Sequence, residues 1–471
     1  MRNDRVETGI THLDAALQGG LPRGSLTLVA GNPGTGKTIL CGEFLHKGAS
    51  CGESCLYVSL SEGRDSFLEY MGRLGRDFTD PQTRSHLDIL DLVSVKEEGL
   101  DILMEMIITR VDTQRVQRLV VDSFTALSNA LTASIDARVT LHILSKILGQ
   151  ATCTTLLVTE VPTGTSRLGM GVEEFVADGI ISLRRRVVNG STLRELEITK
   201  MRGTLVERPL HLFTLHGGFN ALPPFQPAEI SQPRPYTPRP DREDTYSTGN
   251  QQLDTLTGGL RRGDTVYVDM GDSVPPMVPA LLVGPLRSNF LAQGRGVLFM
   301  PPGGENLDRI HRFDQQFALG PRAAKLVRIA TAPNNQGGRP PELALDPRDP
   351  DAALRAWADS EEELSRETGG PLLKIIYVDS LRTCLPHADH RRFLDHQSMR
   401  ARDAGGLLVL LSRPGDDHLR QHAGNLAHTH LQVTNHEGVM LLQGVKPRTP
   451  LHAVAQDPAQ GHPSLSLTPI Y

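Results

Sequence analysis

An eight-residue stretch, GNPGTGKT, has the residue types and the spacing needed to bind a nucleoside triphosphate. It matches the pattern G-x-x-x-x-G-K-[ST] at every fixed position. Glycines let backbone N–H groups approach the phosphate oxygens, the lysine brings a positive charge to the β and γ phosphates, and the threonine hydroxyl can ligate Mg²⁺. We therefore expect ATP and Mg²⁺ to bind at Gly31, Asn32, Pro33, Gly34, Thr35, Gly36, Lys37, Thr38 and Ile39.

The segments on either side of this stretch support the prediction. An apolar run at 26–30 precedes it and predicts a buried strand, and a helical pattern at 39–45 follows it. The phosphates would then lie at the N-terminus of a helix, where free N–H groups and the helix dipole favour anions. Strand, loop and helix in this order favour a phosphate site over a chance glycine-rich turn.

Two acidic residues follow apolar runs and are candidates for the rest of the site. Asp122 ends the run 118–122, and we expect its carboxylate to hold Mg²⁺ together with Thr38. Glu62 follows the run 55–60, so it would lie at the same sheet edge and could accept a proton from the attacking water. The alternative for Glu62 is an exposed loop residue without a catalytic role.

Lys200 and Arg202 form a pair of cations on a predicted strand. Two residues apart, they would project to one face and could stabilise the charge on the terminal phosphate. Their spacing leaves open whether they serve their own site, act on the nucleotide of a neighbouring subunit, or form a solvated basic edge.

The chain repeats itself in the same order after roughly 240–257 residues. The repeated segments are Thr8–Asp14 with Thr248–Asp254, Gly19–Gly24 with Gly258–Gly263, Val120–Ser123 with Tyr377–Ser380, Thr155–Thr159 with Leu407–Leu411, and Lys200–Arg202 with Lys446–Arg448. We infer two copies of one domain, at residues 1–220 and 247–471, joined by a proline-rich extended linker at 221–246.

The second copy lacks the phosphate-binding sequence. It reads GDSVPPMV where the loop should stand, with no lysine and with two prolines that have no N–H to offer a phosphate. Pro301-Pro302-Gly303-Gly304 replaces the glutamate region, and Asp379 alone persists. We expect the second domain to bind no triphosphate.

Alternating apolar runs and helical stretches predict an α/β fold, with a mostly parallel sheet covered by helices on both faces. Asn189-Gly190 is a hairpin signal and predicts antiparallel strands at the sheet margin. The predicted strands of the first copy are 26–30, 55–60, 87–92, 118–122, 154–159, 179–185 and 193–201, with helices at 100–111 and 137–150.

Bulk properties restrict the class of protein. The 471 residues are 39% hydrophobic and 22% charged, with a net charge of −5, which disfavours nucleic acid as a partner. The only compact cationic cluster in the first copy is Arg184-Arg185-Arg186. Five cysteines predict no disulfide framework, and the absence of a long apolar run or secretion signal predicts a cytoplasmic protein without membrane contact.

The first copy resembles the KaiC-like branch of the RecA superfamily of ATPases. The resemblance rests on T-G-x-x-x-L-D from Thr8, GGLPRG, GNPGTGKT, VVDSFTAL, VEEFVADGIISLRRR and ITKMRGT. It implies two tandem RecA-like P-loop domains, a homo-hexameric ring of two tiers, and ATP at subunit interfaces. It also implies that Lys200 and Arg202 reach the neighbour's γ-phosphate. The family places two adjacent glutamates where this chain has Ser61-Glu62.

The leading hypothesis is a slow Mg²⁺-ATPase, active in the first domain only, whose nucleotide state controls ring assembly and an unidentified signalling partner. The family's clock members phosphorylate themselves in the second copy, but residues 422–430 here offer no adjacent Ser-Thr pair, so we expect no autokinase activity. The alternatives are a DNA-dependent recombination or repair ATPase and a non-catalytic, nucleotide-gated scaffold.

Overall fold

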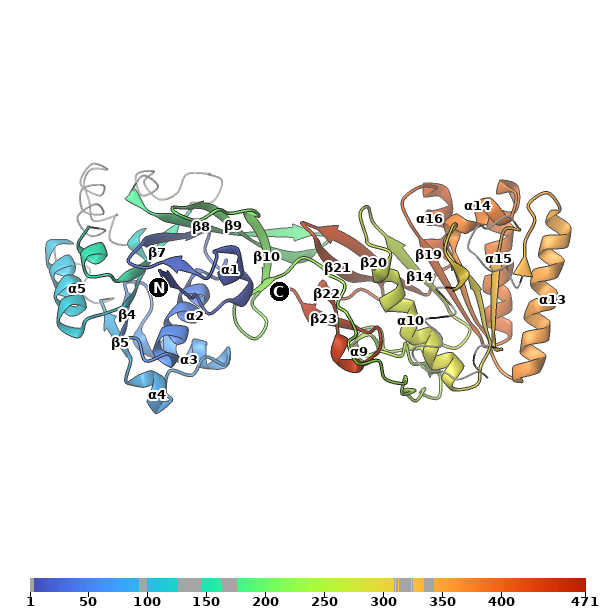
Figure 1. Cartoon of the computed structure of the whole chain (residues 1–471), viewed down its shortest axis with the longest axis horizontal. Coiled ribbons are helices and arrows are strands. Elements are labelled where there is room, and N and C mark those ends of the chain that lie inside the picture. The colour runs from blue at the N-terminus through green and yellow to red at the C-terminus, as the bar shows by residue number, and fades with distance from the viewer. Residues whose placement is uncertain are drawn as a thin grey trace. The chain divides into compact units, whose positions relative to one another are not determined.

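The computed structural model describes residues 4–92, 100–125, 146–161, 176–308, 310, 312, 323, 325–333 and 343–471. The chain divides into two compact units (Figure 1). The first consists of Met1–Pro223 with Pro469–Tyr471, and the second of Pro224–Thr468.

The first unit is built on a sheet with the strand order β11-β10-β9-β8-β3-β7-β6-β4-β5. Strands β8, β3, β7, β6, β4 and β5 are parallel, whereas β9, β10 and β11 continue the sheet in antiparallel fashion. The strands of the unit are β1 (Arg5–Val6), β2 (Leu21–Pro22), β3 (Leu26–Gly31), β4 (Cys55–Ser59), β5 (Leu87–Asp91), β6 (Arg118–Asp122), β7 (Thr154–Glu160), β8 (Gly179–Val188), β9 (Ser191–Met201), β10 (Leu210–Thr214) and β11 (Asn220–Leu222). The first five predicted strands are confirmed to within one residue at each end.

Helices cover both faces of this sheet, as predicted (Figure 1). On one face, Phe44 and Phe67 of α2 and α3 are fully buried in a core that also includes Val29 of β3. On the other face, Ile107 of α5 packs with Leu28, since successive residues of a strand point to opposite faces. The helices are α1 (Thr11–Ala16), α2 (Lys37–Ser50), α3 (Arg64–Arg73), α4 (Pro81–Arg84) and α5 (Leu100–Gln114). The predicted helix at 137–150 lies mostly outside the described residues.

The hairpin between β8 and β9 is confirmed. Val188 pairs with Ser191, and Asn189 and Gly190 have φ angles of 49° and 73°. Positive φ at both positions matches the right-handed twist of the strands, and asparagine and glycine tolerate it best. This turn sets the register of the whole hairpin and so determines where each β9 side chain lies.

The second unit has a ten-stranded sheet with the order β17-β16-β15-β18-β19-β14-β20-β21-β22-β23. Its first six strands and β20 are parallel, and β21 and β22 follow in antiparallel fashion. The strands of the unit are β12 (Thr245–Tyr246), β13 (Leu260–Arg261), β14 (Thr265–Met270), β15 (Val297–Met300), β16 (Val327–Thr331), β17 (Leu343–Ala344), β18 (Leu373–Tyr377), β19 (Leu407–Ser412), β20 (Thr429–His436), β21 (Val439–Lys446), β22 (His452–Gln456) and β23 (Leu465–Pro469). Both units therefore place antiparallel strands beside a parallel core.

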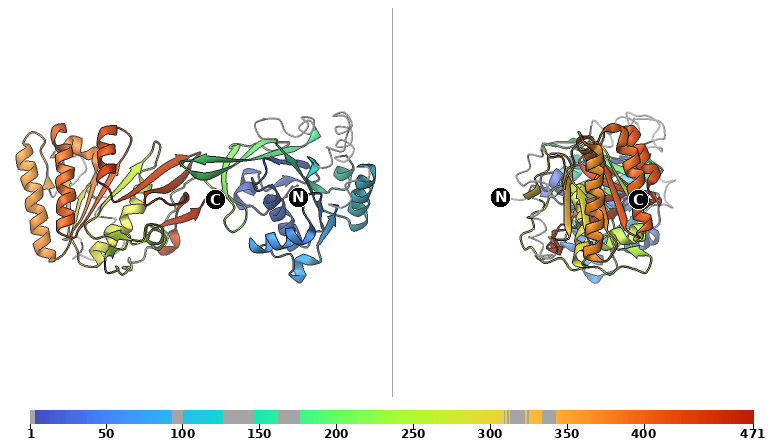
Figure 2. Two further views of the ribbon diagram at one scale, coloured as in Figure 1. Left: turned by 180° about the vertical axis from the view of Figure 1, so that it is seen from behind. Right: turned by 90° about the vertical axis from the view of Figure 1, so that its right-hand side faces the viewer.

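Helices again cover both faces. Leu281 and Phe290 of α10 pack on one face, and Trp357 of α13 meets Phe393 of α15 edge to face on the other. Figure 2 shows these two helices in orange, on the face opposite α10. The helices are α9 (Gln251–Thr257), α10 (Met277–Ala292), α13 (Pro350–Thr368), α14 (Leu381–Cys384), α15 (His390–Asp403) and α16 (Asp417–Leu426). Among the helices that are described, none is long and apolar enough to cross a lipid bilayer.

The proline-rich segment between β11 and β12 contains neither helix nor strand. Its backbone forms hydrogen bonds with the second unit. The N–H of Phe225 donates to the carbonyl of Gly438, and the N–H of Arg234 donates to the carbonyl of Gly461, both at 2.8 Å. Tyr236 is buried in the same unit. The segment is thus extended and packed against the second domain along its length.

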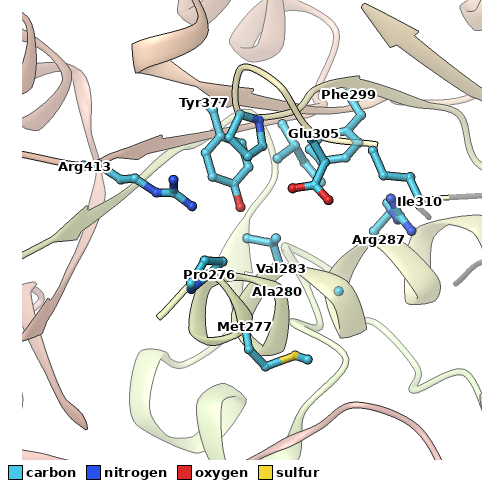
Figure 3. A pocket seen from close by; sticks show the side chains of 13 residues that line it. Pro276, Met277, Ala280, Val283, Arg287, Phe299, Glu305, Ile310, Tyr377 and Arg413 are labelled. Atoms are coloured by element: carbon cyan, nitrogen blue, oxygen red, sulfur yellow. The ribbon is translucent and has the colours of Figure 1, made fainter. Parts of the chain in front are cut away.

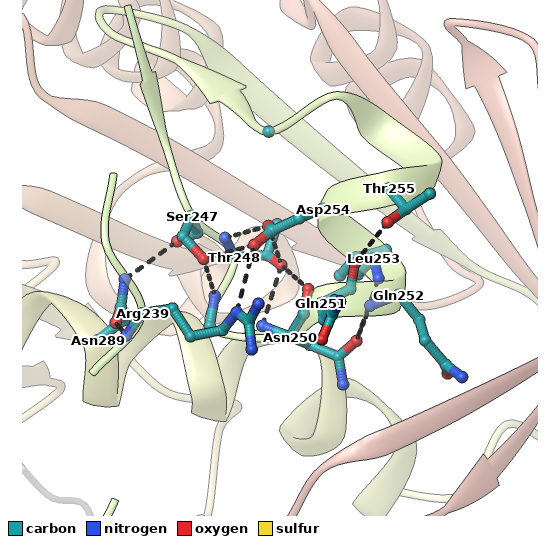
Figure 4. A network of polar contacts seen from close by, with 12 residues as sticks. Arg239, Ser247, Thr248, Asn250, Gln251, Gln252, Leu253, Asp254, Thr255 and Asn289 are labelled. Atoms are coloured by element: carbon teal, nitrogen blue, oxygen red, sulfur yellow. Dashed lines mark hydrogen bonds and ion pairs between the residues drawn. The ribbon is translucent and has the colours of Figure 1, made fainter. Parts of the chain in front are cut away.

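The repeated T-G-x-x-x-L-D motif forms the same local structure in both units. In the second, the backbone N–H and hydroxyl of Thr248 both donate to Asp254 Oδ1 at 2.6 Å (Figure 4). In the first, Thr8 donates the same two bonds to Asp14 Oδ1 at 2.6 and 2.7 Å. A carboxylate that accepts several N–H and O–H donors holds the chain tightly as it enters the helix. The motif is structural in both copies.

Candidate nucleotide-binding site

The phosphate loop lies between β3 and α2, as the sequence predicts. Gly34 and Gly36 have φ angles of 74° and 106°, which residues with a Cβ atom adopt only under strain. Helix α2 begins at Lys37, so the loop leads into a helix N-terminus. The Lys37 ammonium donates to the carbonyls of Gly31 and Asn32 at 2.9 and 3.0 Å, and burial lowers its pKa. A buried cation at the loop suits an anionic ligand.

The side chains of Thr38, the last residue of the loop sequence, and Asp122 are hydrogen-bonded to each other. The Thr38 hydroxyl donates to Asp122 Oδ2 at 2.7 Å, and the Tyr57 hydroxyl lies 3.4 Å from the same oxygen. Burial raises the pKa of Asp122 despite these donors and Lys37. A hydroxyl and a carboxylate side by side fit Mg²⁺, which prefers oxygen ligands and keeps several waters.

Glu62 lies at the same edge of the sheet. Ser59 and Asp122 are paired across β4 and β6, and the Ser59 hydroxyl binds both the backbone N–H and the carbonyl of Glu62. This contact fixes the backbone at Glu62 while its side chain remains exposed. Partial burial and the charge of Asp122 raise the pKa of Glu62 above its ordinary 4.5.

Arg194 also belongs to the site, although the sequence analysis did not identify it. Its Nη1 donates to the carbonyl of Gly34 at 3.1 Å and to that of Thr35 at 3.4 Å. Arg194 reaches the loop because the hairpin pairs it with Arg185, at the edge where β3 ends. Only the hairpin register could have revealed this, because no motif marks the position.

Lys200 and Arg202 lie at the other end of the parallel strands, where β3 begins. Lys200 pairs with Ile180, which in turn pairs with Leu28 near the start of β3. Its ammonium donates to the carbonyl of Ala177 at 2.8 Å, and Arg202 forms an ion pair with Asp178 at 3.1 Å. The two cations are therefore together but remote from the phosphate loop of their own unit.

The second unit repeats the Lys200 contact, although it lacks the lysine and threonine of the phosphate loop. Lys446 donates to the carbonyls of Gly424 and Ala427 at 2.9 and 3.5 Å, just before β20, as Lys200 does before β8. The lysine contact therefore has a structural role at the strand end in both copies. Arg202, with its side chain 60% exposed, is the freer of the two cations in the first unit.

The residues expected to bind phosphate and metal in the first unit are replaced in the second. Counting from Gly271, Met277 stands where Lys37 does, and Val278 where Thr38 does. Val278 is fully buried and cannot ligate a cation. Oδ1 of Asp379, the counterpart of Asp122, is buried without a hydrogen-bond partner among the described residues.

Comparisons with known proteins relate the first unit to one family. The family described as "ATPase: KaiC" matches residues 6–219. A UPF0273 protein of Thermotoga maritima is 32% identical over 225 residues, which cover 45% of this chain and 92% of the relative. A crystal structure of a KaiC-like protein from Pyrococcus horikoshii is 32% identical, with 46% of this chain and 99% of that one covered and a TM-score of 0.42.

One relative spans both units. Protein GvpD2 of Halobacterium salinarum is 27% identical over 483 residues, covering 94% of this chain and 93% of its own length. The duplication seen in the sequence and in the two sheets is thus shared with a relative of the same extent. This chain belongs to the KaiC family of RecA-like ATPases, with the domain present twice.

Proposed function

We propose that this protein is a slow Mg²⁺-dependent ATPase that binds and hydrolyses ATP in its first unit only. The supporting observation is the contrast between the two units. The first brings together Lys37, Thr38 and Asp122, whereas the second has Met277 and Val278 at the corresponding positions. We further propose that the nucleotide state controls assembly and binding of a signalling protein.

Each residue of the first unit would have a distinct task. Lys37 and the loop N–H groups bind the β and γ phosphates, and Thr38 and Asp122 hold Mg²⁺. Mg²⁺ supplies positive charge that offsets the charge of the phosphates. Glu62 accepts a proton from the attacking water, because it lies at the same sheet edge and has a raised pKa suited to a base.

The position of Lys200 and Arg202 supports a ring of identical subunits, which we take to be a hexamer. Side chains at the edge remote from their own loop can meet a loop only in another subunit. Such a head-to-tail contact closes into a ring when its rotation permits. Arg202 would then stabilise the transition-state charge from next door, as an arginine finger does.

The number of nucleotides bound per chain tests the restriction to the first unit. Titration of the full chain with a non-hydrolysable ATP analogue and Mg²⁺ should give one site per chain. Lys37→Ala should remove that site, and the matched substitution Met277→Ala in the second unit should leave it unchanged. Two sites per chain, or a site that survives Lys37→Ala, would contradict the proposal.

Arg194→Ala is expected to raise the Kd for ATP about tenfold, since charge-assisted hydrogen bonds to the loop carbonyls are lost. Without them, the N–H groups of Gly34 and Thr35 are less well aimed at the phosphates. The measurement is ATP titration by calorimetry. Arg184→Ala is the control, because the Arg184 guanidinium forms an ion pair with Glu197 at 2.8 Å instead of binding the loop carbonyls. Equal affinities in both variants would exclude this role.

The pH dependence of hydrolysis should reflect Glu62. A base must be ionised, so kcat/KM should fall as the pH drops through the pKa of Glu62 in the free enzyme. Because that pKa is raised, the midpoint should lie above 4.5. The residual rate of Glu62→Gln should show no such decline at pH values where the protein stays folded. A midpoint at or below 4.5 would assign the base elsewhere.

A non-catalytic scaffold is the second candidate, favoured by Ser61 in place of a second glutamate. A scaffold of this kind would bind ATP but release no more phosphate than the Lys37→Ala variant does.

The DNA-dependent alternative finds less support, because Arg184 and Arg186 form ion pairs with Glu197 and Glu195 on the adjacent strand. Stimulation of turnover by single-stranded DNA would revive it.

A further inference from the structure

The second unit contains a cavity of about 150 Å³ between α10 and the carboxyl ends of β15 and β18 (Figure 3). Met277, Ala280 and Val283 of α10 form one wall, and Phe299 and Ile375 form the other. The carboxyl edge of a parallel sheet is where ligands bind in α/β folds, and the first unit has its phosphate loop at the corresponding edge. The position is that of a ligand site, but the lining is mainly apolar.

Tyr377 and Arg413 are two of the four polar side chains that line this cavity. Tyr377 is only 5% exposed, and Figure 3 shows its hydroxyl directed toward α10. That hydroxyl has no hydrogen-bond partner among the residues that the structure describes. A hydroxyl that faces a cavity and has no protein partner can donate its hydrogen bond to a bound acceptor. Burial raises the pKa of Tyr377, so the group remains a donor.

Arg413, which follows β19, is the second group. Its guanidinium extends toward the Tyr377 hydroxyl in Figure 3, and it forms no ion pair within the described part of the chain. Of the charged groups that act on the pKa of Tyr377, Arg413 has the largest effect, ahead of Asp379, Glu305 and Arg287. A positive charge close to the Tyr377 hydroxyl favours a ligand whose negative group lies at that point.

We propose that the cavity binds a small monocarboxylate with an apolar body about the size of one ring, its carboxylate held by Arg413 and Tyr377. An apolar cavity of about 150 Å³ in another protein takes up benzene, which sets the size of the body. A planar carboxylate matches the fork of a guanidinium. Triphosphate does not fit, because Pro275 and Pro276 offer no N–H and Met277 no charge. The unit that lost its nucleotide site thus carries a site of different chemistry.

Binding of benzoate to the full-length protein tests the proposal. Saturation-transfer NMR and calorimetry should show one saturable site per chain. Arg413→Met should weaken benzoate at least about tenfold, and Tyr377→Phe about threefold or more, since one charged and one neutral hydrogen bond are lost. Benzyl alcohol, which has the same ring without the charge, should bind Arg413→Met and the parent protein alike.

Three further variants make the test decisive. Ala280→Leu fills the cavity and should abolish benzoate binding, with an unchanged circular dichroism spectrum and unchanged ATP binding in the first unit as evidence of folding. Arg382→Met, at an exposed site on α14, should bind benzoate normally. Lys37→Ala should also bind it normally, which separates this site from the nucleotide site. No saturable binding, or binding that survives Ala280→Leu, would overturn the proposal, as would equal loss of benzoate and benzyl alcohol in Arg413→Met.

Discussion

Glu62→Gln should lower the rate of ATP hydrolysis by roughly 10²–10⁴-fold, the usual contribution of a positioned general base. Glutamine keeps the size and hydrogen-bonding capacity of the side chain but cannot accept a proton. The backbone of Glu62 is held by Ser59 in either case, so the loop should keep its structure. Phosphate release at saturating ATP measures the effect.

The affinity for nucleotide separates this prediction from a structural one. Lys37, Thr38 and Asp122 are untouched, so the Kd for ATP should change by less than about threefold, the loss being confined to kcat. Glu69→Gln, on the exposed surface of α3, is the matched control and should turn over normally. If Glu62→Gln turned over at the parent rate, the base would have to be another group and Glu62 an ordinary loop residue.

Arg202→Ala should lower turnover by roughly 10³-fold or more, as expected when an arginine finger is removed. The physical reason is distance along the sheet. Arg202 lies at the end of the sheet where β3 begins and its own phosphate loop at the end where β3 ends, so we propose that its charge acts on another subunit. Lys200→Ala should have the smaller effect, because its ammonium binds the carbonyl of Ala177 in the way that Lys446 binds that of Ala427.

Mixing two inactive variants tests action between subunits directly. When Arg202→Ala and Glu62→Gln subunits assemble together at equal amounts, about a quarter of the head-to-tail interfaces should combine an intact loop with an intact arginine. Turnover should then recover to about a quarter of the parent rate, although neither variant is active alone. Arg448→Ala, the matched position in the second unit, should leave turnover unchanged. If mixing restored no activity, action across the interface would be excluded.

Local sequence was sufficient for the elements that bind phosphate. The loop at Gly31–Thr38, the strands on which it depends and Asp122 follow from short contiguous patterns, because N–H geometry and side-chain alternation are local properties. The replacement of the phosphate-loop residues in the second unit was equally visible, since a proline and a missing lysine act at their own positions. The duplication could be read because order is preserved over the whole chain.

Long-range pairing determined the rest. Arg194 approaches the loop, and Lys200 and Arg202 do not, only because the β8–β9 hairpin runs antiparallel at one particular register. The alternation of residues along a strand predicts which face of the sheet each side chain is on, but it does not predict the register with the neighbouring strand. The cavity beside Tyr377 likewise arises because α10 packs on both β15, which follows it directly in the chain, and β18, which is distant in the chain. The sequence by itself therefore determined which unit carries the residues of a phosphate loop, whereas the tertiary structure decided which cations lie close to that loop and formed the cavity of the second unit.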